Sequence, residues 1–241
     1  MARVALVTGG TRGLGAAIAK DLKAVGHTVV VCDVVEEQIT KFQADTGVAG
    51  FKIDVSNFES VEAGVKTIES QVGPIDILVN NAGITRDGFL HKMDPIQQWQ
   101  AVINVNLGSV FNTCRCVVPG MRERSWGRII NISSMNGQRG QFGQTNYSAA
   151  KAGMLGLTRA LAQEVSNKGV TVNAVCPGFI LTEMTGTMPK EILEAEVKKI
   201  PIGRIGYPED IGHMVAFLAS DQASFITGAT MSVNGGQYMA A

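Results

Sequence analysis

Short apolar runs rich in β-branched residues alternate along this chain with longer segments in which apolar residues recur at helical spacing. The apolar runs predict strands at 4–8, 28–32, 50–55, 75–80, 128–133, 170–175 and 230–233. The longer segments predict helices near 13–25, 35–46, 57–72, 95–122, 146–168 and 208–220. Runs such as VALVT and TVVVC are apolar almost throughout, which indicates strands buried on both faces, as in a parallel sheet covered by helices.

The regular alternation of strand and helix predicts the fold class. We expect an α/β protein with a doubly wound, parallel, seven-stranded sheet of Rossmann type and right-handed crossovers. The 241 residues show no linker, repeat or low-complexity tract, so we expect a single domain over 1–241. One segment, 182–206, breaks the alternation just after a strand end and contains Pro189 and Pro201. We interpret it as a substrate lid, with a purely structural excursion as the alternative.

Composition and charge narrow the classes of function. Apolar residues make up 45% of the chain and charged residues 17%, as is typical of a globular protein. Lys+Arg and Asp+Glu both number 21, so we expect neither a nucleic acid nor an anionic membrane as partner. No apolar run approaches the ~18 residues that a membrane span needs. The first predicted strand begins too close to Met1 to leave room for a signal peptide.

The cysteines give no sign of a metal site. Cys114 and Cys116 form a close pair, but no second pair of cysteines or histidines stands at ligand spacing. We therefore expect no bound metal, and we expect Cys32, Cys176 and the close pair to be free thiols in a reducing cytoplasm.

A glycine-rich turn follows the first predicted strand. It reads TGGTRGLG from Thr8 to Gly15, with the spacing G-x-x-x-G-x-G, and a predicted helix begins within it. Glycines let the backbone turn sharply and approach a pyrophosphate, which the N-terminus of the helix binds. The turn predicts a dinucleotide site, although a turn of this composition can also be purely structural.

Polar residues at the ends of the next strands favour the dinucleotide site. Asp33 ends the second strand about 20 residues after the glycine turn, where a carboxylate accepts hydrogen bonds from the adenosine ribose. Asp54 ends the third strand, in a position to meet the adenine. Asn81 follows the fourth strand, and the small residues Ala82 and Gly83 after it let a cofactor lie close.

Asp33 and Arg12 favour different cofactors. A carboxylate at the ribose repels the 2′-phosphate of NADP(H), whereas Arg12 in the glycine turn could attract it. Because the carboxylate lies nearer to the phosphate position, we favour NAD(H), and NADP(H) stays the alternative.

Tyr147 and Lys151 form a Y-x-x-x-K motif at the start of an alanine-rich helix. The i, i+4 spacing places both on one face of the helix, so that their tips can converge. A nearby ammonium favours the tyrosinate, and lowering a phenol pKa from ~10 to ~7 takes about 4 kcal/mol. The motif alone is common and is usually a solvated helix face, so its context has to decide whether it is catalytic.

That context resembles the short-chain dehydrogenase/reductase family over essentially the whole chain. Six motifs stand in the family order: TGGTRGLG, NNAG, NVNLGS, INISS, YSAAK and PGFILT. The resemblance implies an NAD(P)(H)-dependent oxidoreductase that acts on a CH–OH group. A protein that only senses NAD(P) is disfavoured, because the catalytic residues of the family are all present.

The resemblance also implies residue roles. Tyr147 would transfer a proton to the substrate oxygen, which Ser134 would hydrogen-bond. Lys151 would lower the pKa of Tyr147 and bind the nicotinamide ribose, and Asn106 would hold a water beside Lys151. On the residues alone, Asn106 could instead satisfy backbone groups and Ser134 could cap a strand end. The implied cofactor-binding residues are Gly9, Thr11, Arg12, Gly13, Leu14, Gly15, Asp33, Asp54, Val55, Asn81, Ala82, Gly83, Tyr147, Lys151, Pro177, Gly178, Ile180 and Thr182.

Within the family, the segment 136–147 resembles most the reductases of acetoacetyl-CoA in polyhydroxyalkanoate synthesis, and GITRD, MRERSWGR, ALAQE and NGGQ agree with it. This likeness implies an acyl-CoA thioester substrate and an (R)-3-hydroxybutanoyl-CoA product. The implied substrate contacts are Asp87, Ser134, Gln141, Phe142, Gln144, Tyr147, Gly178 and Phe179.

Reduction of carrier-protein thioesters in fatty-acid synthesis is the alternative. A carrier protein is acidic and favours exposed cations near the site, as do the phosphates of coenzyme A. The candidates for either are Arg86, Arg122, Arg124 and Arg139. Members of the family are usually tetramers, so we expect a homotetramer with the apolar faces near 101–118 and 149–162 in its interfaces.

Overall fold

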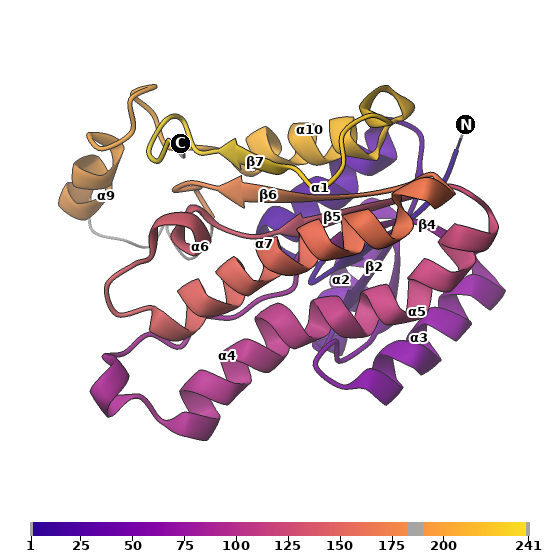
Figure 1. Cartoon of the computed structure of the whole chain (residues 1–241), viewed down its shortest axis with the longest axis horizontal. Helices are drawn as coiled ribbons and strands as arrows, with labels where there is room; N and C mark the ends of the chain where they lie inside the picture. Colours follow the sequence, from indigo (N-terminus) through magenta and orange to yellow (C-terminus); the bar gives the residue numbers. More distant parts are fainter. Residues whose placement is uncertain (1, 183–189, 240–241) are drawn as a thin grey trace.

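A computed structural model describes residues 2–182 and 190–239 of the chain. Its centre is a seven-stranded parallel sheet in the order β3-β2-β1-β4-β5-β6-β7, flanked by helices on both faces (Figure 1). The strands are β1 (Val4–Thr8), β2 (Thr28–Asp33), β3 (Ala49–Lys52), β4 (Ile75–Asn80), β5 (Gly127–Ile132), β6 (Val170–Pro177) and β7 (Thr230–Val233). The predicted doubly wound fold is therefore confirmed.

Successive side chains of a strand point to opposite faces of the sheet. Because helices cover both faces, side chains on both sides of a strand are buried, which explains the continuously apolar runs. In β1, Ala5 and Val7 pack with one core and Leu6 with the other. One face is covered by α1 (Gly13–Ala24), α2 (Glu36–Thr46) and α10 (Pro208–Ala219), and the other by α3 (Phe58–Gln71), α5 (Ser109–Glu123) and α7 (Thr145–Val165).

Two of the observed helices were not predicted. The five-residue helix α6 (Met135–Arg139) follows β5, and α9 (Lys190–Val197) lies in the segment expected to be irregular. Strand β3 is shorter than expected. Beyond Lys52 the chain turns, because the backbone N–H of Asp54 donates to Ser60 Oγ and the Asp54 carboxylate accepts from the backbone of Ser56.

The helical stretch Pro95–Glu123 bears on the expectation about membrane spans. It comprises α4 (Ala101–Ile103), flanking π-helical turns and α5. Its length and composition would suffice to cross a membrane, although no apolar run of that length was expected. Such a helix is weak evidence for a membrane protein, because core helices of globular proteins pass the same test. Here Val110, Val117 and Met121 belong to the core against the sheet, so we interpret the stretch as a core helix.

The expected lid, 182–206, lies in part outside the described residues, which omit 183–189. Its two ends are fastened together beside the end of β6. Leu181 N donates to Gly206 O at 2.8 Å, and Gly206 N donates to Phe179 O at 3.0 Å. Helix α9 extends from this anchored base at the left of Figure 1. A role as a lid stays a prediction.

Candidate active site

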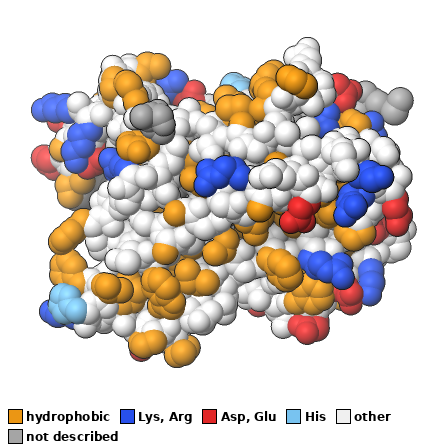
Figure 2. Space-filling view, viewed as in Figure 1, with side chains coloured by type: hydrophobic (Ala, Val, Ile, Leu, Met, Phe, Trp, Pro, Cys, Tyr) orange, Lys and Arg blue, Asp and Glu red, His pale blue; other side chains and the backbone are white. Residues whose placement is uncertain are grey.

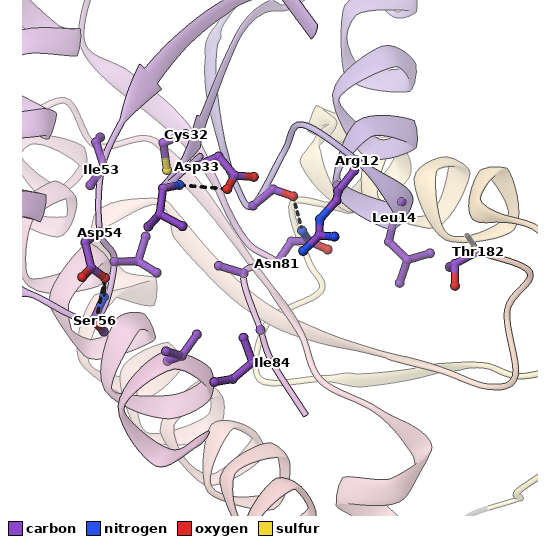
Figure 3. Close-up of a pocket in the computed structure, with 18 residues that line it drawn as sticks. Arg12, Leu14, Cys32, Asp33, Ile53, Asp54, Ser56, Asn81, Ile84 and Thr182 are labelled. Carbon is purple, nitrogen blue, oxygen red and sulfur yellow. Dashed lines mark hydrogen bonds between the residues drawn. The ribbon is translucent and has the colours of Figure 1, made fainter. Parts of the chain in front are cut away.

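A cavity of about 640 Å³ lies where β1, β2 and β4 end, and the glycine turn forms one of its walls (Figure 3). Gly9 has φ +58°, a conformation that glycine adopts without a steric cost. At Gly15 a Cβ would collide with the Gly9 carbonyl oxygen and would lie 2.6 Å from Asn81 Nδ2. The glycine turn can therefore pack this closely on itself and on Asn81 only because these two positions lack side chains.

Asn81 holds the loop after β4 against the glycine turn. Its Nδ2 donates to Thr8 O at 2.9 Å and to Gly9 O at 3.0 Å, while its backbone N donates to Thr8 Oγ1. The Asn81 amide thus shapes the cavity wall. Sequence reasoning placed Asn81 at the site but did not give it this task.

Asp33 is fixed at the end of β2. Its Oδ2 accepts from Thr11 Oγ1 at 2.5 Å and its Oδ1 from Val34 N at 2.8 Å. Arg12, one residue after Thr11, is exposed on the rim of the same cavity. Asp54 and Ser56 line the end of the cavity opposite to Leu14 and Thr182 (Figure 3). The residues predicted to meet the adenosine, Asp33 and Asp54, thus lie at the opposite end of the cavity from Leu14 and Thr182.

A second cavity, of about 440 Å³, continues from the first and contains Ser134, Tyr147 and Lys151. Six residues line both cavities: Arg12, Leu14, Asn81, Gly83, Ile84 and Thr182. Pro177, Gly178 and Ile180 line the second cavity as well. A molecule bound along the glycine turn can therefore extend to the three candidate catalytic side chains.

Short-range packing brings these three side chains together. Ser134, just after β5, is the N-cap of α6, and its Oγ accepts from Asn136 N at 3.1 Å. Helix α6 lies so close to α7 that a Cβ on Gly137 would be 2.7 Å from the carbonyl carbon of Lys151. The Ser134 oxygen accepts the bond from Asn136 N, and its O–H is the donor in a hydrogen bond with Tyr147.

Burial dominates the electrostatics of Tyr147 and Lys151. The Lys151 ammonium is buried, donates to Ile132 O at 2.7 Å and lies 5.7 Å from the centre of the Tyr147 ring. Burial lowers the pKa of Lys151 to about 8. Burial also raises the pKa of Tyr147, a hydrogen bond with Ser134 opposes the rise, and Asp87 adds to it. The expected lowering of the Tyr147 pKa by Lys151 does not appear here and stays a prediction for the site with a bound cofactor.

Asn106 is fully buried in the π-helical turn Asn104–Gly108. Its Oδ1 accepts from Ile84 N at 2.8 Å and its Nδ2 donates to Ile84 O at 2.9 Å. A Cβ on Gly83 would lie 3.3 Å from Asn106 Oδ1 and 3.6 Å from Lys151 Nζ, so the three residues are neighbours. Asn106 therefore satisfies backbone groups beside Lys151, which was the alternative for this residue; the water is still a prediction.

The two loops that carry the expected substrate residues are joined to each other. Gln144 Nε2 donates to Asp87 Oδ2 at 3.0 Å, and Gln144 Oε1 accepts from Asn136 Nδ2 at 3.1 Å. The backbone adds a bond from Gly88 N to Gly143 O at 2.8 Å. Gln144 thus holds the mouth of the cavity together, and one N–H of its amide remains for a substrate.

Phe142 does not wall an enclosed acyl pocket in this structure. It is 84% exposed and meets the ring of Phe89 edge to face at 5.3 Å. Figure 2 shows apolar side chains gathered at the lower left, over the loop and short helices before α4. The exposed apolar residues of this region are Phe89, Leu90, Ile96, Trp99 and Phe142. On the other side of the cavity, Phe179 N donates to Gln237 Oε1 at 3.0 Å, which fixes the segment after β6.

Sequence reasoning missed Asn146, which is completely buried. Its Nδ2 donates to Arg86 O and to Gln98 O, each at 3.0 Å, and its Oδ1 accepts from Tyr147 N at 2.8 Å. Asn146 therefore anchors the 84–98 loop to the start of the catalytic helix. Its position directly before Tyr147 was the available signal.

Two of the four candidate arginines are far from the site. Arg124 Nη2 donates to Ile75 O, at the start of β4, and its Nε lies 3.3 Å from Asp76 Oδ1. Arg122 lines a groove between α5 and α7. Because the site lies at the opposite, carboxyl edge of the strands, only Arg86 and Arg139 remain as candidates at its mouth. Among the described residues, no group of three or more His, Cys, Asp or Glu side chains could hold a metal.

The fold and the site define a class of protein. Residues 9–237 match a family model described as enoyl-(acyl carrier protein) reductase. The chain belongs to this family, the short-chain dehydrogenases/reductases, and it is an oxidoreductase of the NAD(P)(H)-dependent kind.

Individual relatives match over nearly the full length. The chain is 57% identical to the acetoacetyl-CoA reductase of Shinella zoogloeoides over 240 residues, 99% of each chain. It is 55% identical to the acetoacetyl-CoA reductase of Rhizobium meliloti over 242 residues, 100% of each chain. It is 49% identical to the 3-oxoacyl-[acyl-carrier-protein] reductase of Pseudomonas aeruginosa over 242 residues, 98% of each chain.

Proposed function

We propose that this protein reduces acetoacetyl-CoA to (R)-3-hydroxybutanoyl-CoA with a nicotinamide cofactor and so supplies polyhydroxybutyrate synthesis. The observation that carries the proposal is the cavity that joins the glycine turn to Ser134, Tyr147 and Lys151. The full-length relatives at 57% and 55% identity, both acetoacetyl-CoA reductases, support the substrate.

The reaction needs a hydride, which a reduced nicotinamide supplies when bound along the glycine turn and the segment Pro177–Thr182. The protein supplies the proton and the orientation. The Ser134 O–H donates to the keto oxygen, and Tyr147 Oη transfers its proton to the same oxygen as negative charge develops there. A raised pKa keeps Tyr147 protonated at neutral pH, which suits the direction of reduction. The Lys151 ammonium would hold the ribose of a bound nicotinamide cofactor, and its charge would stabilise the tyrosinate that proton transfer leaves.

For the cofactor we propose a preference for NADH. The Asp33 carboxylate is held at the adenosine end by Thr11 and Val34, where it accepts from ribose hydroxyls and repels a 2′-phosphate. The exposed Arg12 on the same rim supports the opposite choice, NADPH.

The experiment is a spectrophotometric assay at about 340 nm that crosses NADH and NADPH with acetoacetyl-CoA and acetoacetyl-carrier protein at matched concentrations. We expect the highest kcat/KM with acetoacetyl-CoA. A clear preference for the carrier protein would assign the enzyme instead to fatty-acid synthesis, as the relative at 49% identity suggests.

We further propose a homotetramer in the cytoplasm. Helices α5 and α7 present a groove lined by Phe111, Val118, Leu157 and Leu161, and Phe111 is 58% exposed. A second copy would cover this apolar surface. The four free thiols support a reducing compartment. Light scattering on the wild type and on Phe111→Glu tests the assembly, and a wild-type monomer would refute it.

A further inference from the structure

Arg139 is oriented in a way that leaves its charge unneutralised. It is the last residue of α6, its side chain is exposed, and both of its acceptors are neutral amides. Its Nε donates to Asn136 Oδ1 at 3.3 Å and its Nη2 to Gln141 Oε1 at 3.1 Å. Within residues 2–182 and 190–239, Arg139 has no carboxylate at ion-pair distance, whereas Arg124 and Arg204 each have an aspartate.

This arrangement suits an anion. A guanidinium has five N–H donors, and two of them serve here to fix its position. The other three remain available in a fork that matches the geometry of a phosphate. Because amides and not carboxylates hold the side chain, an incoming phosphate does not have to displace a competing negative charge.

The same amides connect Arg139 to the catalytic residues. Asn136, which accepts from Arg139, donates through its backbone to Ser134 Oγ and through its side chain to Gln144. Gln144 in turn precedes the catalytic helix and donates to Asp87. Arg139 is therefore fixed relative to the reacting carbonyl, although it lies outside the lining of the catalytic cavity.

Arg86 is a second such cation on the other loop. It lines the cavity that contains Tyr147, and its Nη1 donates to a neutral acceptor, Thr85 O, at 3.1 Å. The neighbouring carboxylate, Asp87, accepts from Gln144 at 3.0 Å. Two arginines thus stand on the two joined loops at the mouth of the cavity.

We propose that Arg139, together with Arg86, binds the phosphates of the coenzyme A moiety while the acyl end reacts at Tyr147. The inference rests on the proposed function and assigns the part of the substrate that these side chains recognise. In this role the two arginines determine the specificity for a thioester that carries phosphates, and they take no part in the chemical step.

The test compares acetoacetyl-CoA with the acetoacetyl thioester of N-acetylcysteamine, which has the same reacting group and no phosphate. For Arg139→Gln we expect kcat/KM on acetoacetyl-CoA to fall about fivefold, mainly through KM, as the upper end of the range for an exposed charged contact gives. On the phosphate-free thioester the same variant should change by less than about twofold, because no phosphate contact is lost. Arg139→Lys should restore part of the loss, and added salt should weaken the wild type more than Arg139→Gln.

Lys168→Gln is the control for the loss of one exposed cation, since Lys168 is exposed in the turn after α7 and lines neither cavity. This control should leave kcat/KM unchanged on both thioesters. An equal loss on both thioesters in Arg139→Gln would mean that Arg139 only shapes the loop, and no loss on acetoacetyl-CoA would place the phosphates elsewhere. Either result overturns the inference while leaving the proposed function intact. A wild type inactive on acetoacetyl-CoA would refute the proposed function itself.

Discussion

Replacing Lys151 by Met should stabilise the fold while destroying the activity. The ammonium is 3% exposed and donates to one carbonyl, Ile132 O. Its pKa of about 8, against 10.5 for a free lysine, means that the charged form is disfavoured in the fold. At ~1.4 kcal/mol per pH unit this amounts to about 3 kcal/mol at neutral pH. The loss of the hydrogen bond to Ile132 O destabilises the variant by about 1 kcal/mol. The free energy of unfolding of Lys151→Met should therefore exceed that of the wild type by about 2 kcal/mol.

The stabilisation by Lys151→Met should depend on pH. Between the folded pKa of about 8 and the unfolded pKa of ~10.4, the unfolded state binds more protons, so wild-type stability rises with pH. At pH ~9.5 the penalty falls to about 1 kcal/mol, and the advantage of Lys151→Met should then nearly vanish. The loss of charge through pH 8 should also weaken cofactor binding in the wild type.

Urea unfolding followed by tryptophan fluorescence, at pH 7 and 9.5, measures this difference. Lys168→Met, at an exposed lysine, is the control and should show no such pH dependence. If Lys151→Met were less stable than the wild type at pH 7, or if its advantage did not change with pH, a buried charged lysine would be the wrong account of this site.

Four further changes test the site. Tyr147→Phe should lower kcat by about 10²–10⁴-fold with cofactor binding largely intact, and more than a tenth of wild-type kcat would refute its role as proton donor. Asp33→Ser should raise kcat/KM for NADPH, because it removes the repulsion of the 2′-phosphate; a wild type that already prefers NADPH tenfold or more contradicts this reasoning. Gln144→Ala should lower kcat/KM for acetoacetyl-CoA by about ten- to a hundredfold without unfolding the protein, which circular dichroism checks. Asn146→Ala should lower the free energy of unfolding by about 2–4 kcal/mol, since three part-buried backbone groups lose their partner and the buried amide leaves a gap; a change below about 1 kcal/mol would show that water replaces the amide.

Local sequence patterns were sufficient to predict the sheet, the helices on its two faces and the position of the glycine turn that lines the larger cavity. These features depend on local patterns. Apolar runs specify strands buried on both faces, and the glycines of TGGTRGLG mark the one turn whose backbone must approach both Asn81 and a ligand. The i, i+4 spacing likewise sufficed to place Tyr147 and Lys151 together, because a helix fixes that geometry wherever it lies.

The surroundings of those residues depend on packing between distant parts of the chain. Helix α6 has five residues, too few for a periodic pattern, and it depends on the Ser134 cap and on the contact of Gly137 with Lys151. Gln144 and Asn146 also bond to Asp87, Arg86 and Gln98, which lie 57, 60 and 48 residues away in sequence. Burial, which sets the direction of the pKa shifts of Tyr147 and Lys151, is likewise a property of the packed chain. By residue type alone, four arginines were equal candidates for binding the phosphates of the substrate. The direction of α5 places Arg122 and Arg124 at the opposite edge of the sheet from the site. Position in space, and not residue type, therefore determines which charges face a ligand.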